Sequence, residues 1–301
     1  MLPNWYFDYK NFIETSLVEY LEQYFASEKN SALDTIKEAS FYAVKNGKRI
    51  RSILALEFYL ILSGKTFSEI KNDDDIIKFC IALELLHAYS LVHDDLPCMD
   101  NDEYRRGELT VWKKYSDTLA TLTGDLLNSL SFEILAEIGN STLIKAFGES
   151  VGIKGMLGGQ VLDLFYEKNP EKLTLENLLE VHNKKTGALI EVSVFGGLIL
   201  GNLSLSPDKK YKKEHLEKYI KYGKKIGLAF QVKDDILDVE GTFEETGKSV
   251  GGEQKGFVYF LGLDKSRQYL ENLTEENLEI ISDLQSEKLE FLTQYISQRK
   301  K

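Results

Sequence analysis

The sequence predicts an all-α protein, and three observations support this fold class. Its 301 residues include only four prolines, so long stretches contain no obligatory helix breaker. Apolar residues recur at intervals of three and four along most of the chain, which is the spacing of amphipathic helices. Alternating apolar and polar runs bounded by turn residues are essentially missing. Because no linker or internal repeat stands out, we expect one large helical domain over residues 1–301.

The expected helices follow from the apolar spacing in chain order. In residues 5–25, the apolar positions Phe12, Ile13, Leu17 and Leu21 fall on one helix face. The pattern continues at 41–62, with an interruption near Gly47, and at 73–96, 116–138, 141–166, 174–201, 211–239 and 275–298.

Charge, cysteine content and hydropathy exclude several classes of protein. The 37 basic and 48 acidic residues give a net charge of −11, which argues against a nucleic-acid-binding surface. Cys80 and Cys98 form neither a metal-like pair nor a disulfide framework, which favours a reducing cytoplasm. The N-terminus has no basic region followed by an apolar run, so no signal peptide is expected. No uninterrupted apolar stretch of about 18 residues suggests a membrane span.

The stretch 85–107 ends an apolar helical segment in a burst of carboxylates. The run contains Asp94, Asp95, Asp100, Asp102 and Glu103, and it is followed by Arg105 and Arg106. Such a run is most often a solvated acidic loop. The alternative is a cluster that collects divalent cations and, through them, a phosphorylated ligand.

Pro97 affects how the first acidic cluster can act. On a continuous helix, Asp94 and Asp100 would point about 240° apart, which cannot serve one metal site. Pro97 has no N–H for the carbonyl of His93 and disfavours continuation of the helix. We therefore expect the helix to end or kink there, so that Asp100 returns beside Asp94.

A second acidic cluster follows another apolar run, at 230–238 in FQVKDDILD. Asp234 and Asp238 are four residues apart, on one helix face and about 6 Å apart along the axis. Like charges at this spacing, joined by Asp235, destabilise an isolated helix. Two clusters of this kind are hard to explain as solvation alone. Together they would make an oxygen-lined site for Mg²⁺.

Basic residues supply a second kind of candidate binding site. In GKRIR at 47–51, Lys48 and Arg51 would share one face if the segment is helical. His87 lies seven residues before Asp94, on the same helix face. Lys, Arg and His suit a phosphate group that recruits no metal. The alternatives are a basic surface turn for GKRIR and a core histidine for His87.

These residues carry a family resemblance. HDDLPCMDNDEYRRG (93–107) and FQVKDDILD (230–238) resemble the first and second aspartate-rich motifs of the trans-isoprenyl diphosphate synthases, or polyprenyl synthetases. GKRIR, GMLGGQVLDL (155–164), KTGALI (185–190) and YISQRK (295–300) match further segments in the family's order. The resemblance runs from about residue 40 to the C-terminus and is strongest to bacterial enzymes that make farnesyl diphosphate.

The resemblance implies helices around a deep central active-site cavity, the isoprenoid synthase fold, and assigns the charged residues. The metal ligands would be Asp94, Asp95, Asp100, Asp234, Asp235 and Asp238, holding three Mg²⁺ ions. The residues that bind the allylic diphosphate would be Arg105, Lys185, Thr186, Gln231 and Lys248. Those that hold isopentenyl diphosphate without metal would be Lys48, Arg51, His87 and Arg106. The catalytic set would be Asp94, Asp100, Arg105, Lys185, Asp234 and Lys248.

The implied reaction is head-to-tail prenyl transfer, and its product length depends on few residues. The spacing DDx₄D occurs in bacterial farnesyl and in plant-type geranylgeranyl synthases, and the CMDND wording resembles the latter. Tyr89, with Ser90 beside it, stands five residues before Asp94, about 7.5 Å deeper along the helix. In the family an aromatic residue here closes the elongation pocket near fifteen carbons. The alternative is that Tyr89 is an ordinary core aromatic. We expect farnesyl diphosphate, with geranylgeranyl diphosphate as the alternative.

Two segments depart from the family pattern. Ser52 stands where proline usually follows the basic element, and little effect is expected. The segment 247–263 is shortened where the family has a flexible loop, although Lys255 could supply its second lysine.

Three other functions remain open. A terpene cyclase would carry a different second metal motif in place of DDILD. A non-catalytic partner subunit of a heteromeric prenyltransferase typically loses one aspartate cluster, whereas both are present here. A helical scaffold with acidic patches would bind no ligand. The resemblance further implies a cytoplasmic homodimer.

Overall fold

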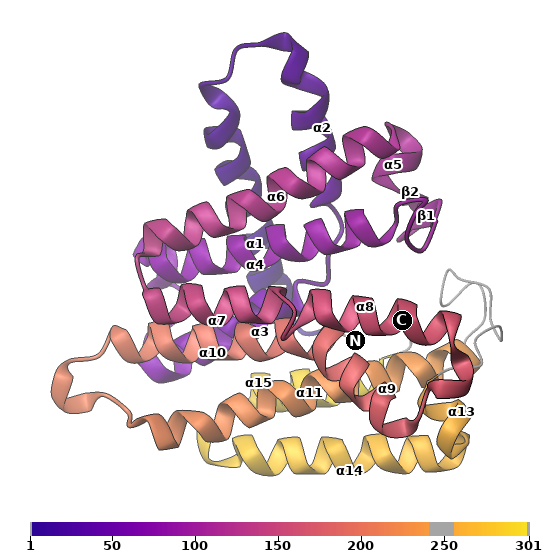
Figure 1. Ribbon diagram of the computed structural model, residues 1–301. Coiled ribbons are helices and arrows are strands. Elements are labelled where there is room, and N and C mark those ends of the chain that lie inside the picture. Colours follow the sequence, from indigo (N-terminus) through magenta and orange to yellow (C-terminus); the bar gives the residue numbers. More distant parts are fainter. Residues whose placement is uncertain (1, 241–255, 300–301) are drawn as a thin grey trace. The chain divides into compact units, whose positions relative to one another are not determined.

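The computed structural model describes residues 2–240 and 256–299, and this part of the protein is built almost entirely from α-helices (Figure 1). The predicted all-α class is confirmed. In chain order the helices are α1 Asn4–Ala26, α2 Asp34–Ala43, α3 Ile50–Ser63, α4 Asp74–Asp94, α5 Val111–Lys114, α6 Asp117–Ile138, α7 Ser141–Val151, α8 Met156–Lys168, α9 Leu175–His182, α10 Ala188–Leu203, α11 Lys213–Glu240, α13 Phe257–Leu261, α14 Leu263–Ile281 and α15 Glu287–Gln298. The strands β1 Tyr104–Arg105 and β2 Glu108–Leu109 form a short antiparallel hairpin.

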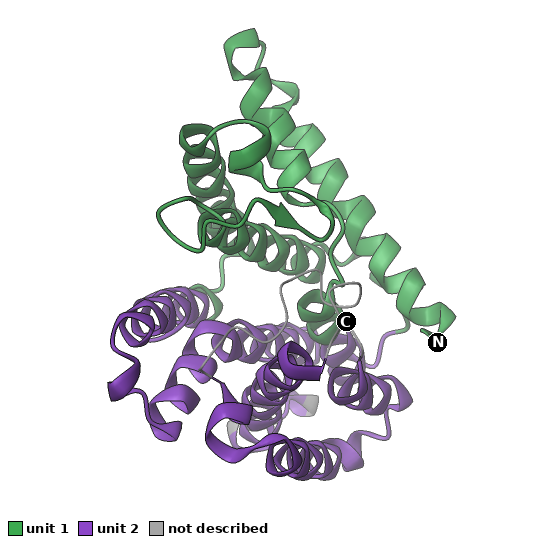
Figure 2. Cartoon of the chain, turned by 90° about the vertical axis from the view of Figure 1, so that its right-hand side faces the viewer, with its two compact units in different colours: residues 1–56, 66–144 green, residues 57–65, 145–301 purple. Residues whose placement is uncertain are grey.

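The chain divides into two compact units (Figure 2). The first unit contains residues 1–56 and 66–144, and the second contains residues 57–65 and 145–301. Helix α3 therefore contributes its first half to the first unit and its second half to the second. That the chain forms one domain stays a prediction.

The first unit is organised around α4, which lies along α6 and also contacts α1 and α2 (Figure 1). Helix α1 buries a face with a spacing of three and four residues, through Tyr9, Ile13, Leu17 and Leu21. Helix α4 is buried around most of its circumference. An apolar cluster surrounds the last turn of α4 and the segment after it, formed by Ala39, Val92, Leu96, Val111 and Ala120. This packing fixes the point at which the acidic segment leaves the helix.

The second unit is organised around α11, which contacts α10, α14 and α15. Its buried positions include Tyr222, Ile226, Ala229 and Ile236, again at helical spacing. Between α9 and α10 the backbone widens into a π-helical turn, Asn183–Gly187, which contacts both α8 and α11. The motif residues predicted at 185–190 begin in this turn.

Two of the predicted helices are interrupted in the structure, where each corresponds to two separate helices. The expected helix at 141–166 is interrupted after Val151, and α8 begins only at Met156. A Cβ on Gly155 would lie 2.0 Å from the carbonyl oxygen of Ser150, so this turn requires glycine. The expected helix at 275–298 is interrupted between α14 and α15, where Gln285 has a φ of 49°.

Two helical stretches of the described chain are long and apolar enough to cross a membrane by length and composition alone. They are Asp74–Asp94 and Leu175–Leu203. Of their most apolar windows, 67% and 61% are buried within the protein. Core helices of a folded protein pass the same test.

Candidate active site

The first acidic cluster begins where α4 ends. The helix finishes at Asp94, and Asp95 caps it with helical φ and ψ angles. The chain then turns through Leu96 to Met99, whose N–H donates to the Leu96 carbonyl at 2.9 Å. The N–H of Asp100 donates to the carbonyl of Asp94 at 2.9 Å. The prediction that the chain turns back at Pro97 and returns Asp100 beside Asp94 is therefore confirmed.

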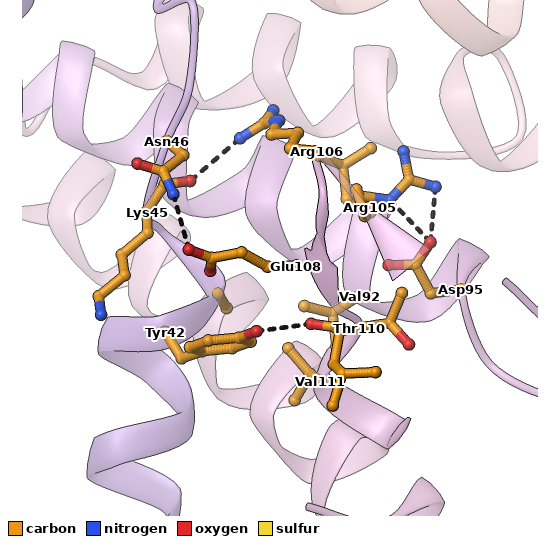
Figure 3. Close-up of a pocket in the computed structure, with 13 residues that line it drawn as sticks. Tyr42, Lys45, Asn46, Val92, Asp95, Arg105, Arg106, Glu108, Thr110 and Val111 are labelled. Atoms are coloured by element: carbon orange, nitrogen blue, oxygen red, sulfur yellow. Dashed lines mark hydrogen bonds and ion pairs between the residues drawn. The ribbon is translucent and has the colours of Figure 1, made fainter. Parts of the chain in front are cut away.

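Asp95 forms an ion pair with Arg105. It is only 3% exposed, and its Oδ1 accepts bonds from Nε and an Nη of Arg105 at 2.7 and 2.5 Å (Figure 3). Burial raises the pKa of Asp95, and the bond from Arg105 offsets this only in part. Arg105 lies on β1, so the hairpin positions its guanidinium against the end of α4. Asp95 thus orients a residue predicted to bind diphosphate.

Arg106 occupies the turn of the hairpin with a φ of 55°. Its guanidinium donates to the carbonyl of Lys45 at 3.1 Å, across a small pocket lined by the 42–46 segment and the hairpin (Figure 3). Burial lowers the pKa of Arg106, and the neighbouring Arg49 and Arg105 lower it further. Glu84 and Asp95 act in the opposite direction, and the crowding of three arginines favours an anionic ligand.

In the basic element 47–51, the residues before Ile50 are not helical. Helix α3 begins at Ile50, and Arg49 has a φ of 57°, so Lys48 and Arg51 do not share one helix face. The conditional expectation of an i, i+3 pair is wrong because left-handed backbone at Arg49 interrupts the helical repeat. Lys48 is exposed, and its carbonyl accepts a bond from the Tyr6 hydroxyl at 2.5 Å.

Arg51 and His87 meet in the first unit. An Nη of Arg51 lies 3.3 Å from Nε2 of His87. Burial lowers the pKa of His87 well below its usual range, and the neighbouring Arg51 and Arg106 add to the effect. His87 is therefore neutral near pH 7, and its buried Nδ1 makes no hydrogen bond within the described part of the chain. A neutral imidazole here can donate one hydrogen bond to an anion.

Tyr89 and Ser90 lie on α4 between His87 and Asp94. Tyr89 is 7% exposed, and its ring meets the His93 ring edge to face, with 4.9 Å between centroids. Burial raises the pKa of Tyr89, with Asp125 and Asp94 contributing. Ser90 donates to the carbonyl of His87 at 2.9 Å.

The second acidic cluster lies near the end of α11. Asp235 accepts from the N–H of Phe257 at 2.7 Å, and its Oδ2 lies 3.2 Å from Nε2 of His182. Asp234 has its Oδ1 2.6 Å from an Nη of Arg299, while Oδ2 is 3.5 Å from Nε2 of Gln231. Asp238 is exposed. In both motifs the second aspartate of the DD pair is bound by the protein itself.

Lys185 and Thr186 lie on the π-helical turn. Nζ of Lys185 donates to Oδ2 of Asp163, on α8, at 2.7 Å. A Cβ on Gly159 would lie 2.2 Å from the backbone nitrogen of Lys185, and one on Gly227 would lie 2.8 Å from Cα of Gly187. Glycines on α8 and α11 therefore let both helices approach the turn closely. This explains Gly159 of the 155–164 motif, and π-helical turns often mark functional sites.

Arg299 is a residue that the sequence interpretation did not single out. Its side chain is 4% exposed and donates both to Asp234 and to the carbonyl of Phe230 at 3.0 Å. The guanidinium carbon also lies 3.8 Å from the centre of the Phe230 ring. It lies in YISQRK (295–300), one of the segments that match the family's order. Lys248 and Lys255 lie outside the described residues.

The carboxylates fit magnesium as donors. Asp94, Asp100, Asp234 and Asp238 offer hard oxygen atoms, and Mg²⁺ binds through one or two carboxylates together with water and phosphate. Within residues 2–240 and 256–299, no group of three or more His, Cys, Asp or Glu side chains is arranged to hold a metal by itself. The four carboxylates are candidate magnesium ligands, two in each unit.

Comparison with known proteins identifies the family. Residues 33–292 match the family model of polyprenyl synthetase. The chain belongs to the polyprenyl synthetase family. The activity of this family is transfer of prenyl groups between isoprenyl diphosphates, and the predicted resemblance is confirmed.

Three relatives illustrate the range of the family. The chain is 38% identical to farnesyl diphosphate synthase from Micrococcus luteus over 98% of this chain and 97% of the relative. It is 35% identical to a chloroplastic geranylgeranyl pyrophosphate synthase from Arabidopsis thaliana over 83% and 72%. Among solved structures, a geranyltransferase from Helicobacter pylori, complexed with magnesium and isoprenyl diphosphate, superimposes with a TM-score of 0.75 at 32% identity, over 98% and 97%. Relatives with different product lengths are thus similarly close.

Proposed function

We propose that this polyprenyl synthetase is a magnesium-dependent farnesyl diphosphate synthase. It would condense isopentenyl diphosphate with dimethylallyl or geranyl diphosphate to give (E,E)-farnesyl diphosphate and diphosphate. The observation that carries the product assignment is Tyr89, a buried aromatic residue on α4 five positions before the first aspartate of the motif. The whole-length similarity to farnesyl diphosphate synthase supports the same assignment.

The allylic diphosphate is proposed to bind through both aspartate motifs and the cations beside them. Asp94, Asp100 and Asp234 would hold Mg²⁺, which would neutralise charge on the departing diphosphate. Three ions per site is the expected number. Asp95 keeps the Arg105 guanidinium in place to receive the diphosphate oxygens, and Asp163 does the same for Lys185. Further contacts are proposed for Thr186, Gln231 and Lys248.

Isopentenyl diphosphate is proposed to bind in the first unit without metal. Lys48, Arg51 and Arg106 supply positive charge, and neutral His87 supplies a hydrogen-bond donor. The separation of 3.3 Å between Arg51 and His87 supports a shared ligand for these two side chains.

The chemical steps need no protein nucleophile. The C–O bond of the allylic diphosphate breaks, and its electron pair leaves with the diphosphate. The double bond of isopentenyl diphosphate then attacks the allylic cation, forming the new C–C bond. The proton lost from the condensed product passes to the released diphosphate. The protein binds and orients both substrates and excludes water from the cation.

A second candidate product is geranylgeranyl diphosphate, which the chloroplastic relatives favour. It requires that Tyr89 be only a core residue. A non-catalytic subunit would be a different class of protein, and intact aspartates in both motifs argue against it. A cytoplasmic homodimer is part of the proposal, and sedimentation of the purified chain tests the oligomeric state.

Incubation of the purified protein with Mg²⁺, isopentenyl diphosphate and either allylic starter tests the function. We expect farnesyl diphosphate as the main product and no turnover in excess EDTA. Absence of any condensed product with both substrates would refute the enzyme assignment. A twenty-carbon main product would replace farnesyl by geranylgeranyl diphosphate.

A further inference from the structure

The basic element 47–51 carries two residues proposed to bind a diphosphate, Lys48 and Arg51, and a third basic residue between them that is buried. Lys48 is exposed, and Arg51 reaches His87, but Arg49 between them is 7% exposed. Arg49 also has a φ of 57°, in the left-handed region that non-glycine residues rarely adopt. Its carbonyl accepts the first helical hydrogen bond of α3, from the N–H of Ile53 at 2.9 Å. Arg49 thus sets both the direction of the turn and the start of the helix.

The side chain of Arg49 holds this strained backbone through contacts that use all its nitrogens. One Nη donates to Oε2 of Glu84 at 2.9 Å, Nε donates to Oε1 of Glu14 at 3.3 Å, and the other Nη donates to the carbonyl of Val44. The guanidinium folds back over Gly47, where an added Cβ would lie 2.7 Å from it. The glycine of the element therefore leaves room for the guanidinium in this position.

Glu84 is the centre of the network. It lies on α4, is 2% exposed, and has both carboxylate oxygens engaged. Oε2 accepts from Arg49, while Oε1 accepts from the hydroxyl of Ser52 at 2.6 Å. Arg49 and Ser52 enclose Arg51 in the sequence, so one carboxylate fixes the chain on both sides of it. Ser52 is fully buried, at the position where the family usually has proline.

The same helix carries the residue that meets Arg51. His87 follows Glu84 by three residues, so both lie on the face of α4 directed at the start of α3. The carboxylate that anchors the turn and the imidazole that faces the ligand are thereby held at a fixed separation. A ligand bound by Arg51 and His87 is sensitive to any shift of α3 along α4.

We propose that Glu84 is a positioning residue for the metal-free diphosphate, acting through Arg49 and Ser52 to place Lys48 and Arg51. This inference rests on the proposed function, because it takes that ligand to be isopentenyl diphosphate. Glu84 does not touch the substrate. Its carboxylate also balances the charge of the buried Arg49 guanidinium, with Nη 2.9 Å from Oε2.

The first experiment measures binding of isopentenyl diphosphate in EDTA by calorimetry, together with steady-state kinetics. Glu84→Gln is expected to weaken this binding and to raise KM for isopentenyl diphosphate by about tenfold, since small misplacements of binding groups have effects of this order. KM for geranyl diphosphate should stay within about twofold. Ser52→Ala should have the same pattern at about threefold.

Two further variants separate positioning from stability. Ser131→Ala removes another fully buried hydroxyl of the first unit, one that bonds only to the carbonyl of Asn128 within its own helix. It should leave both KM values unchanged. Arg49→Met/Glu84→Leu replaces the buried ion pair by apolar groups, which often preserves stability. The thermal midpoint of unfolding of the double variant should be higher than that of Glu84→Gln, while its KM for isopentenyl diphosphate stays above the wild-type value.

Specific results would overturn the inference. Unchanged isopentenyl diphosphate binding in both Glu84→Gln and Ser52→Ala would do so, as would equal loss of affinity for both substrates. Recovery of wild-type KM in the double variant would show that only stability matters. If the wild-type protein binds isopentenyl diphosphate in EDTA but makes no product, the proposed function fails, while the binding comparison still decides the role of Glu84.

Discussion

Replacing Tyr89 by alanine is expected to lengthen the product beyond fifteen carbons. The side chain is 7% exposed, and truncation of a buried aromatic residue typically costs about 3–5 kcal/mol of unfolding free energy. We expect about 3 kcal/mol, because the ring is proposed to border the cavity for the growing chain. His93, which meets the ring at 4.9 Å, has its Nε2 3.0 Å from the Thr121 carbonyl and packs against Gly124. It cannot easily refill the space, which is about the volume of one isoprene unit.

The assay for Tyr89→Ala is chain-length analysis of products made from labelled isopentenyl diphosphate and geranyl diphosphate. Tyr89→Phe is the matched control, because it keeps the ring and removes only the hydroxyl, and its product should remain at fifteen carbons. Thermal unfolding confirms that both variants are folded at the assay temperature. A folded Tyr89→Ala enzyme that still stops at fifteen carbons would refute the role of the ring. Longer products from both variants would assign chain length to the hydroxyl instead.

Three other predictions follow from the charged residues. Asp94→Ala and Asp234→Ala should each lower kcat by at least about 10²-fold, and a near-wild-type rate in either would remove that residue from metal binding. Arg299→Ala should lower the Mg²⁺ concentration for half-maximal activity, since a cation 2.6 Å from Asp234 opposes a metal ion there; an unchanged magnesium titration would contradict this. The pKa of His87 is lower in the folded than in the unfolded protein. As the pH falls through about 6.5, the unfolded chain therefore binds a proton before the folded protein does. The free energy of unfolding should decrease below that pH by at most about 1.4 kcal/mol per pH unit. Urea unfolding at pH 5 and pH 7.5 should show a smaller difference in His87→Gln than in the wild type.

The sequence predicted features that depend on local backbone chemistry. Pro97 implied an end to α4 and a return of Asp100, and the structure has the bond from Asp100 to Asp94. The fold class and most helix positions followed from apolar spacing in the same way. Some helix breaks depend on glycines or on one left-handed residue such as Gln285. These breaks leave the apolar pattern uninterrupted, so the sequence did not reveal them.

The partners of charged side chains could not be predicted, because they come from distant parts of the chain. Asp95 pairs with Arg105, and Asp235 lies 3.2 Å from His182, and the spacing of the two motifs indicates neither partner. Arg299 reaches Asp234 across 65 positions, and Arg49 reaches Glu84 across 35. Spacing along one helix contains no information about such contacts.

The π-helical turn Asn183–Gly187 contains one residue more than an α-helix of the same length would contain. Removing a single residue there would restore regular α-helix and rotate everything on one side of the deletion by about 100°. Lys185 would then leave Asp163, and the apolar face of α10 would leave α11. Insertions and deletions are usually harmless in surface loops, whereas at this position the number of residues is itself a condition for activity. A one-residue deletion scan across α9 and α10 should therefore find its sharpest loss of function here.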